Sequence, residues 1–253
     1  MIATMGSGKS YNYLKSIAKQ EVLDPNDPFY ELVVICSTSS KFDKTVETYK
    51  ELIKKSKLVN VQDTELIFWL NKYMRRILKY NSIFQFILNK CTNPNEELTR
   101  VFEKHRLNNN AKNIKEKQIR YIADKLIKYD WKTYPHRCLL VLDDFANHPL
   151  LRSKETEMCR LLKKLRHFNI NVIICVQTVK SIPRDIKRTL SDLILFPGIG
   201  EEDFNDLIKE SPAGIFDRKK LWTEYNRLTN PQSMFAIHIK AKKIIITIPQ
   251  KTD

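Results

Sequence analysis

The sequence predicts an α/β domain with a mostly parallel sheet flanked by helices, and three observations lead to this prediction. A glycine-containing loop near the start ends in Lys9-Ser10. Short apolar runs predict buried parallel strands at 32–36, 138–144 and 171–178, with a further strand at 193–196. Polar residues stand at the ends of these runs, where α/β sheets place their ligand-binding loops.

The stretch Ala3-Thr4-Met5-Gly6-Ser7-Gly8-Lys9-Ser10 has the pattern of a phosphate-binding loop, with Ala3 in place of the usual first glycine. Its glycines allow a tight turn that aims backbone N–H groups at a phosphate. We expect Lys9 to reach the β- and γ-phosphates of ATP and the Ser10 hydroxyl to bind Mg²⁺. A helix should begin near Lys9 and point its positive end at the nucleotide. The residues expected to contact the nucleotide are Met5, Gly6, Ser7, Gly8, Lys9, Ser10 and Tyr11.

Two alternatives stay open for this stretch. The first is that residues 3–10 form a glycine-rich turn that ends in Lys-Ser by chance. An acidic pair at the end of a later strand argues against this alternative. Only residues 1–4 precede the loop as strand, so either the first strand is very short or the natural protein begins further upstream.

An acidic pair and a glutamine end two later strands. Asp143 is expected to hold Mg²⁺, directly or through water, and Asp144 to polarise the attacking water. Gln177 is placed to contact the γ-phosphate or that water. The simpler alternatives are a solvated acidic turn and a surface glutamine. With a phosphate loop upstream, the pattern favours a nucleotide hydrolase that uses Lys9, Asp144 and Gln177.

The chain is long enough for one large domain, 1–253, and residues 60–135 read as a helical insertion within it. Apolar stripes such as Trp69, Tyr73 and Ile77 predict amphipathic helices there, with Lys and Arg on the polar faces. These faces are either simply solvated or directed at nucleic acid. Near the end, a helix is expected at 216–228, followed by an antiparallel hairpin of 234–239 and 244–248 at the sheet edge.

Composition restricts the class of protein further. Lys and Arg number 44 against 29 acidic residues, and the net charge of +15 favours a polyanionic partner. No apolar run is long enough to span a membrane. The five cysteines show no CxxC spacing, so we expect reduced, mostly buried thiols in an intracellular protein.

The phosphate loop, the Leu-Leu-Val-Leu-Asp-Asp strand and the Gln-ended strand resemble the FtsK/HerA superfamily of P-loop ATPases, which have a RecA/FtsK-like fold. Within it, the sequence is most similar to the DNA-packaging ATPases of poxviruses, giant viruses, virophages and Maverick-type elements. Further similarities are Arg166-His167, Gln177-Thr178 with Ile182-Pro183, and Thr229-Asn230-Pro231. The resemblance covers most of the chain except about 60–135.

This resemblance implies a homo-oligomeric ring, pentamer or hexamer, that hydrolyses ATP with Mg²⁺ and drives double-stranded DNA into a capsid. It further implies capsid portal or vertex proteins as partners, and action at the virus assembly site in the host cell, with association with the virion left open. Family members supply an arginine in trans to a neighbour's nucleotide. That position falls on Lys187, which cannot make the bidentate fork of arginine, so Arg188 is favoured and Arg166 is held in reserve.

Two other functions remain open at this point. One is a different P-loop enzyme, such as a nucleotide kinase or a helicase. The other is a nucleotide-gated DNA-binding assembly protein that does not hydrolyse ATP. Lys9, Ser10, Asp143 and Asp144 are all present, which argues against the second.

Overall fold

The computed structural model describes residues 2, 12–15, 30, 32–37, 57–90, 137–145, 148–152 and 155–248, with Lys57 and residues 79–90 described by their backbone alone. Four parallel strands form the central sheet in the order β2-β1-β3-β4. They are β2 (Lys57–Asn60), β1 (Leu32–Ser37), β3 (Cys138–Asp143) and β4 (Ile170–Ile174). The predicted parallel sheet is therefore confirmed, although β4 starts and ends earlier than the expected 171–178.

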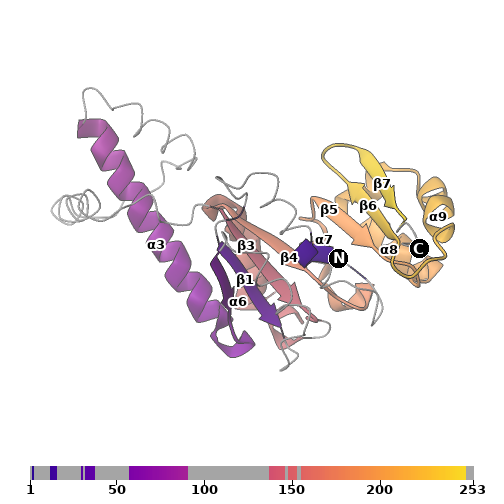
Figure 1. Ribbon diagram of the computed structural model, residues 1–253, viewed down its shortest axis with the longest axis horizontal. Helices are drawn as coiled ribbons and strands as arrows, with labels where there is room; N and C mark the ends of the chain where they lie inside the picture. Colours follow the sequence, from indigo (N-terminus) through magenta and orange to yellow (C-terminus); the bar gives the residue numbers. More distant parts are fainter. Residues whose placement is uncertain are drawn as a thin grey trace.

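Ile2 connects this sheet to the remaining strands. It forms parallel bridges with Val176, just beyond β4, and with Leu195 of β5 (Asp192–Leu195). Its backbone N–H donates to the carbonyl of Ile194 at 2.8 Å, and its own carbonyl accepts from the N–H of Phe196 at 3.0 Å. Ile2 thus lies between the end of β5 and Val176, just beyond the end of β4, close to where Figure 1 marks the N-terminus.

The predicted C-terminal hairpin is also confirmed. β6 (Met234–His238) pairs antiparallel with β5 on one side and with β7 (Lys243–Thr247) on the other. The turn between β6 and β7 carries Lys242 at a φ of 50°, in the left-handed region. β7 forms the edge of this sheet, and its position beside a lysine-rich turn discourages pairing with other chains.

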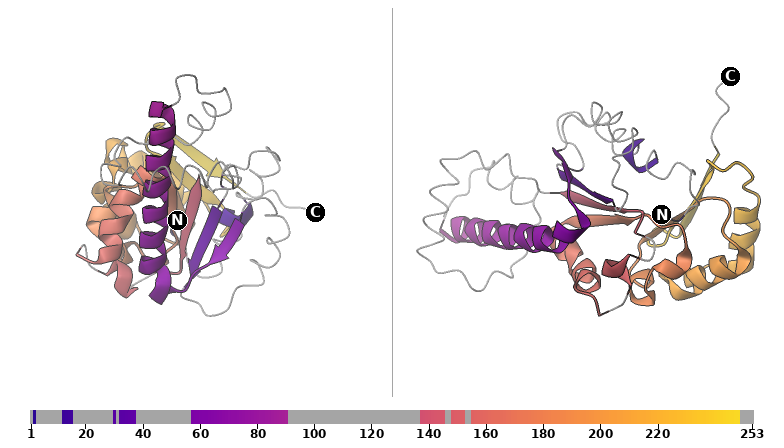
Figure 2. Two further views of the ribbon diagram at one scale, coloured as in Figure 1. Left: turned by 90° about the vertical axis from the view of Figure 1, so that its left-hand side faces the viewer. Right: turned by 90° about the horizontal axis from the view of Figure 1, so that it is seen from below.

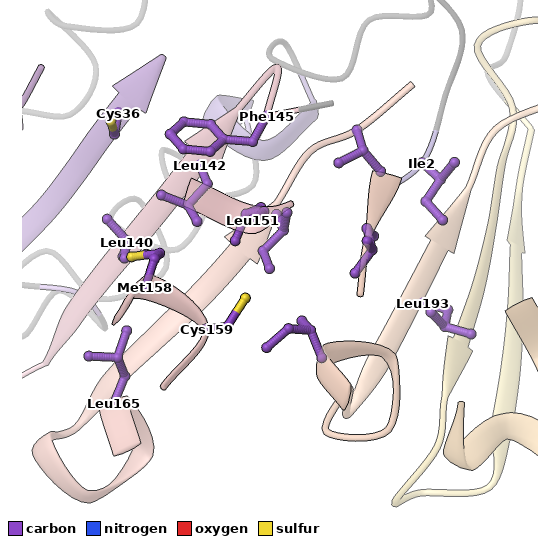
Figure 3. Packing of buried hydrophobic residues seen from close by; sticks show 14 of the residues in the cluster. Ile2, Cys36, Leu140, Leu142, Phe145, Leu151, Met158, Cys159, Leu165 and Leu193 are labelled. Atoms are coloured by element: carbon purple, nitrogen blue, oxygen red, sulfur yellow. The ribbon is translucent and has the colours of Figure 1, made fainter. Parts of the chain in front are cut away.

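Helices cover both faces of the parallel sheet, because the central strands are apolar on both sides. On one face, Leu140 and Leu142 of β3 pack in one cluster with Met158 and Leu165 of α6 (Glu157–Leu165) (Figure 3). On the other face, alternate strand residues pack against Tyr13 and Leu14 from the helical residues 12–15; they are Val33, Ile35, Leu139 and Val141. Figure 2 shows residues 12–15 and the larger helices on opposite sides of the strands.

The long helix α3 (Asp63–Lys90) opens the segment expected to be an insertion. Its buried residues recur at helical spacing and join the main core; they are Leu66, Leu70, Tyr73, Met74 and Ile77. The rings of Trp69 and Tyr73 stack with centroids 5.1 Å apart. The first half of α3 therefore packs on the sheet, and its second half extends away from it (Figure 1). The other residues of the 60–135 stretch, 91–135, lie outside the described residues, so the insertion stays a prediction.

Two helices pack on β5 and β6. α8 (Glu201–Glu210) was not expected, although Phe204, Leu207 and Ile208 give it an apolar stripe behind an acidic first turn. α9 (Arg218–Asn226) is shorter than the expected 216–228 because Asp217 caps it, accepting from the N–H groups of Lys219 and Lys220. The short helices η5 (Pro212–Ile215), η2 (Pro149–Leu151), η3 (Arg166–Phe168), η4 (Val179–Ser181) and α7 (Arg184–Lys187) complete the described elements.

The cysteines of the described residues are free and buried, as expected: Cys36, Cys138, Cys159 and Cys175. Burial raises the pKa of Cys36 to about 12, with a smaller contribution from the Asp63 charge. Burial likewise raises the pKa of Cys138 to about 12. Both thiols therefore stay protonated and act as small apolar core groups. Cys91 lies outside the described residues. Within the described part of the chain, no helix is long and apolar enough to cross a membrane.

Candidate active site

Three of the predicted site residues, Asp143, Asp144 and Gln177, lie at the carboxyl edge of the parallel sheet. Asp143 ends β3, and its register partner on β1 is Ser37, the last residue of that strand. Gln177 follows Val176, the residue that pairs with Ile2. Ile2 runs parallel to Val176 and Leu195, so its chain direction points toward this edge. This is the edge at which α/β sheets bind ligands.

A hydrogen bond connects Tyr13, in the helical residues 12–15, to Asp143 at the end of β3. The Tyr13 hydroxyl donates a hydrogen bond of 3.1 Å to Oδ2 of Asp143, although the two residues are 130 positions apart in the chain. Tyr13 is 2% exposed, so the phenol is fixed by the packing around it. Tyr13 lies three positions after Ser10 in the sequence. The contact thus places the helical residues 12–15 beside Asp143, and sequence reasoning had noted Tyr13 only as part of an apolar stripe.

Asp144 adopts a conformation that aspartate uses rarely. Its φ is 57°, in the left-handed region, and it is the first residue after β3. The strand pairing resumes directly afterwards, since the N–H of Phe145 donates to the carbonyl of Cys175 at 3.3 Å. Asp144 is therefore held between two fixed segments, and such a backbone at a strand end is typical of functional sites.

Gln177 contacts the carboxylate of Asp144. Its Nε2 donates a hydrogen bond of 2.7 Å to Oδ1 of Asp144, and the amide orientation follows because an ionised carboxylate only accepts. Both side chains are partly buried. The pair joins the ends of β3 and β4, so the acidic residue and the glutamine expected to act together are in direct contact.

The loop after Asp144 is anchored by His148. Its Nδ1 accepts from the N–H of Leu150 at 3.2 Å, so the neutral ring carries its proton on Nε2 and donates it to Asp63 at 3.0 Å. This hydrogen bond holds the pKa of the Asp63 carboxyl below its usual value. The ring also packs on the buried ring of Phe145, with centroids 4.6 Å apart. Sequence reasoning missed this cluster, which connects the strand end to the start of α3.

The phosphate loop itself, with Met5, Gly6, Ser7, Gly8, Lys9, Ser10 and Tyr11, lies outside the described residues. Its roles therefore stay predictions. In the described part of the chain, no three His, Cys, Asp or Glu side chains form a metal-binding group. A Mg²⁺ held by Asp143 and Ser10 agrees with this, because such ions take few ligands from the protein and the rest from phosphate and water.

The three candidates for the trans residue have different surroundings. Lys187, at the end of α7, is buried, and its Nζ forms an ion pair of 2.9 Å with Oε2 of Glu210 on α8. Arg188 follows it and is exposed, and so is Arg166 in η3. A lysine that is buried and paired within its own chain cannot reach a neighbouring subunit without unpacking. This favours Arg188 over Lys187, and sequence alone could not separate them.

The Lys187–Glu210 pair gives a first prediction. The Lys187 side chain is only 6% exposed and that of Glu210 is 29% exposed. The lysine charge therefore depends more on this ion pair for its stabilisation than the glutamate charge does. We expect Glu210→Gln to destabilise the fold by about 1–3 kcal/mol, since it leaves a buried charge poorly paired. Lys187→Met should cost less, because Glu210 still faces solvent and Arg184, whose Nε lies 3.8 Å away. Urea unfolding of the two variants measures this difference.

The same pair predicts a pH dependence. The hydrogen bond from Lys187, followed by the charges around it, holds the pKa of Glu210 below its ordinary value. A depressed carboxyl pKa contributes stability above the ordinary value, and that contribution is lost as the pH falls through the folded value. The difference in stability between the wild type and Glu210→Gln should therefore shrink in acid. The assigned role of the ion pair would be contradicted by either of two results. One is a stability difference between the wild type and Glu210→Gln that does not change with pH, and the other is a Lys187→Met variant that is less stable than Glu210→Gln.

The strand order and the acidic strand end are those expected of the P-loop NTPase fold. Residues 64–248, more than half of the chain, match the family model described as "Poxvirus A32 protein". The chain belongs to this family, as the sequence motifs predicted. The matched residues include 64–135, where no family motif was noted, and they begin after the phosphate loop.

Solved structures share the fold. B204, the DNA-packaging ATPase from Sulfolobus Turreted Icosahedral Virus, matches with a TM-score of 0.52 and 15% identity, over 98% of this chain and 95% of that chain. The genome packaging NTPase B204 from Sulfolobus turreted icosahedral virus 2 with AMPPCP matches with a TM-score of 0.51 and 15% identity, over 98% and 95%. These matches confirm the predicted P-loop fold. No curated protein sequence matches the chain.

Proposed function

We propose that this chain is an ATPase that drives double-stranded viral DNA into a capsid. One observation carries the proposal: Asp143 ends β3 and Asp144 follows it at the carboxyl edge of a parallel sheet, in a member of the poxvirus A32 family. A nucleotide hydrolase needs this placement, with a phosphate loop opposite an acidic strand end. The B204 structures, solved with ATP analogues and described as genome packaging NTPases, support ATP as the nucleotide.

The residues divide the work of hydrolysis between them. Water attacks the γ-phosphorus, the bond to the bridging oxygen of the β-phosphate breaks, and ADP and phosphate leave. Asp144 polarises this water and takes up its proton, while Lys9 contacts the β- and γ-phosphates. Gln177 holds the Asp144 carboxylate through its N–H, and its amide oxygen can accept from the same water. Ser10 and Asp143 would hold Mg²⁺, which supplies positive charge to the phosphates when it is bound.

The test of this function is phosphate release from ATP with and without long duplex DNA. We expect hydrolysis that DNA stimulates and that Lys9→Ala abolishes. Lys219→Ala, an exposed lysine on α9, serves as a matched control and should behave as the wild type. ATP hydrolysis that DNA does not stimulate, or that persists in the Lys9→Ala variant, would contradict the proposal.

A second prediction concerns how DNA is bound. With a net charge of +15, binding should rest on phosphate contacts and therefore be largely independent of sequence. The logarithm of the affinity should fall by about 0.9 per phosphate contact for each unit of the logarithm of salt concentration. Fluorescence titration of two unrelated duplexes at several salt concentrations measures both properties. A strong preference for one sequence with little salt dependence would contradict the motor.

The proposal includes partners beyond DNA. The motor is a homo-oligomeric ring of five or six copies, because the arginine for each nucleotide comes from a neighbouring subunit. Capsid portal or vertex proteins would anchor the ring at the site of virus assembly in the host cell. Family membership and the packaging NTPases that share the fold support these assignments.

A further inference from the structure

Helices α3 and α6 lie side by side and run in the same direction. Each follows a strand of the parallel sheet, begins near its carboxyl edge and runs back across the same face. Figure 2 shows the two helices next to each other on that face. At the start of α6, Oε1 of Glu157 accepts a hydrogen bond of 3.0 Å from Nδ2 of Asn71, which lies about two turns into α3. This contact fixes which sides of the two helices face one another.

Helical spacing then places three cations along the shared side. Arg75 lies one turn after Asn71, and Arg160 and Lys164 lie one and two turns after Glu157. Since the two helices run in the same direction, Arg75, Arg160 and Lys164 lie one after another along the side where the helices meet. All three are exposed, and none forms an ion pair with a residue that the structure describes. We call Arg75, Arg160 and Lys164 the α3–α6 basic row.

Charge is distributed unevenly over this helical layer. The basic row stands at the α3–α6 end, and Arg166 and His167 of η3 continue it. At the other end, α8 exposes carboxylates; they are Glu201, Glu202 and Asp206. Lys163, on the far side of α6, is already paired with Asp185 at 3.0 Å and so points to another neighbour. On the shared side of α3 and α6, three exposed cations outnumber the one carboxylate, Glu157, so this side carries a net positive charge.

We propose that the α3–α6 basic row is a surface that binds the phosphates of duplex DNA. This inference rests on the proposed function, and it assigns the DNA to a particular face of the domain. Consecutive turns of a helix are about 5.4 Å apart, so the row offers repeated positive charges to a polyanion rather than one site for a single carboxylate. Exposed Arg and Lys without carboxylate partners are the groups that bind a DNA backbone without reading sequence.

The test compares two triple variants with the same loss of charge. One is Arg75→Gln/Arg160→Gln/Lys164→Gln, and the control is Arg218→Gln/Lys219→Gln/Lys220→Gln, which removes three exposed cations from α9. Arg166 is left intact because it is a reserve candidate for ATP turnover. In salt titrations with one duplex, the slope of the first variant should fall in magnitude by about 2.7, at about 0.9 for each phosphate contact. The control should lose less than one contact, and both should keep the hydrolysis rate measured without DNA.

A third variant keeps the charges: Arg75→Lys/Arg160→Lys/Lys164→Arg should retain the wild-type slope. Equal slopes for the first variant and the α9 control would overturn the proposal. So would an unchanged DNA slope with loss of self-association in sedimentation, which would assign the basic row to the acidic α8 of a second copy. Failure of the wild type to bind DNA in a salt-dependent manner is a different result, because it would contradict the proposed function itself.

Discussion

Asp144→Asn is expected to slow ATP hydrolysis by about 10²–10⁴, the loss typical of a missing general base, while ATP still binds. Asparagine at position 144 should keep the backbone conformation that aspartate has there. Asn tolerates the left-handed region as well as Asp does, so the φ of 57° is kept without new strain. The Asn amide oxygen can still accept from Gln177, so the contact between the two strand ends is retained. Single-turnover phosphate release and binding of a non-hydrolysable ATP analogue measure the two effects separately.

The control is the same chemical change at a distance from the site. Asp217→Asn alters an exposed carboxylate that caps α9, and Asn caps helices about as well. It should leave hydrolysis unchanged. Full activity in Asp144→Asn would remove this residue from the mechanism. Equal losses of binding and of hydrolysis would indicate a role for Asp144 in holding the nucleotide instead.

Arg188→Ala is expected to lower ATP hydrolysis by about 10³–10⁵, the contribution of an arginine that stabilises the transferred phosphoryl group. The topology argues that it acts on a neighbouring subunit. The connection from β4 to β5 starts after Gln177 at the carboxyl edge and must return to the amino edge before Asp192. Arg188 lies four residues before β5, so it is near the amino edge and away from the Asp143 and Asp144 of its own chain.

A mixing experiment tests this trans role. Arg188→Ala and Lys9→Ala should each be nearly inactive alone, because one lacks the arginine and the other lacks a working phosphate loop. Mixed rings should recover activity where an intact loop meets an intact Arg188 from its neighbour. Arg184→Ala is the matched control, since Arg184 is also exposed and lies one turn earlier in α7. It should keep its activity. No recovery in mixtures that co-assemble by sedimentation would move the role to Arg166.

The strands and their functional ends could be predicted from the sequence. Continuous apolar runs at 32–36 and 138–142 can only be buried on both faces, which is the environment of a central parallel strand. Two carboxylates directly after such a run must then lie at the carboxyl edge. The hairpin of β6 and β7 followed from local signals as well. α8 had a readable apolar stripe in Phe204, Leu207 and Ile208 and was overlooked.

Tertiary structure decided which distant side chains meet. The contacts of Tyr13 with Asp143, and of Gln177 with Asp144, join residues 130 and 33 positions apart, and no local pattern encodes them. They depend on the order of the strands, which follows from how helices pack over the crossovers. The burial of Lys187 is a similar case, because its partner Glu210 comes from another helix. Sequence thus determined which faces are apolar and where charged groups stand along the chain. Packing determined their neighbours, because hydrophobic periodicity is a local pattern of the sequence, whereas contacts between distant residues form only in the assembled fold.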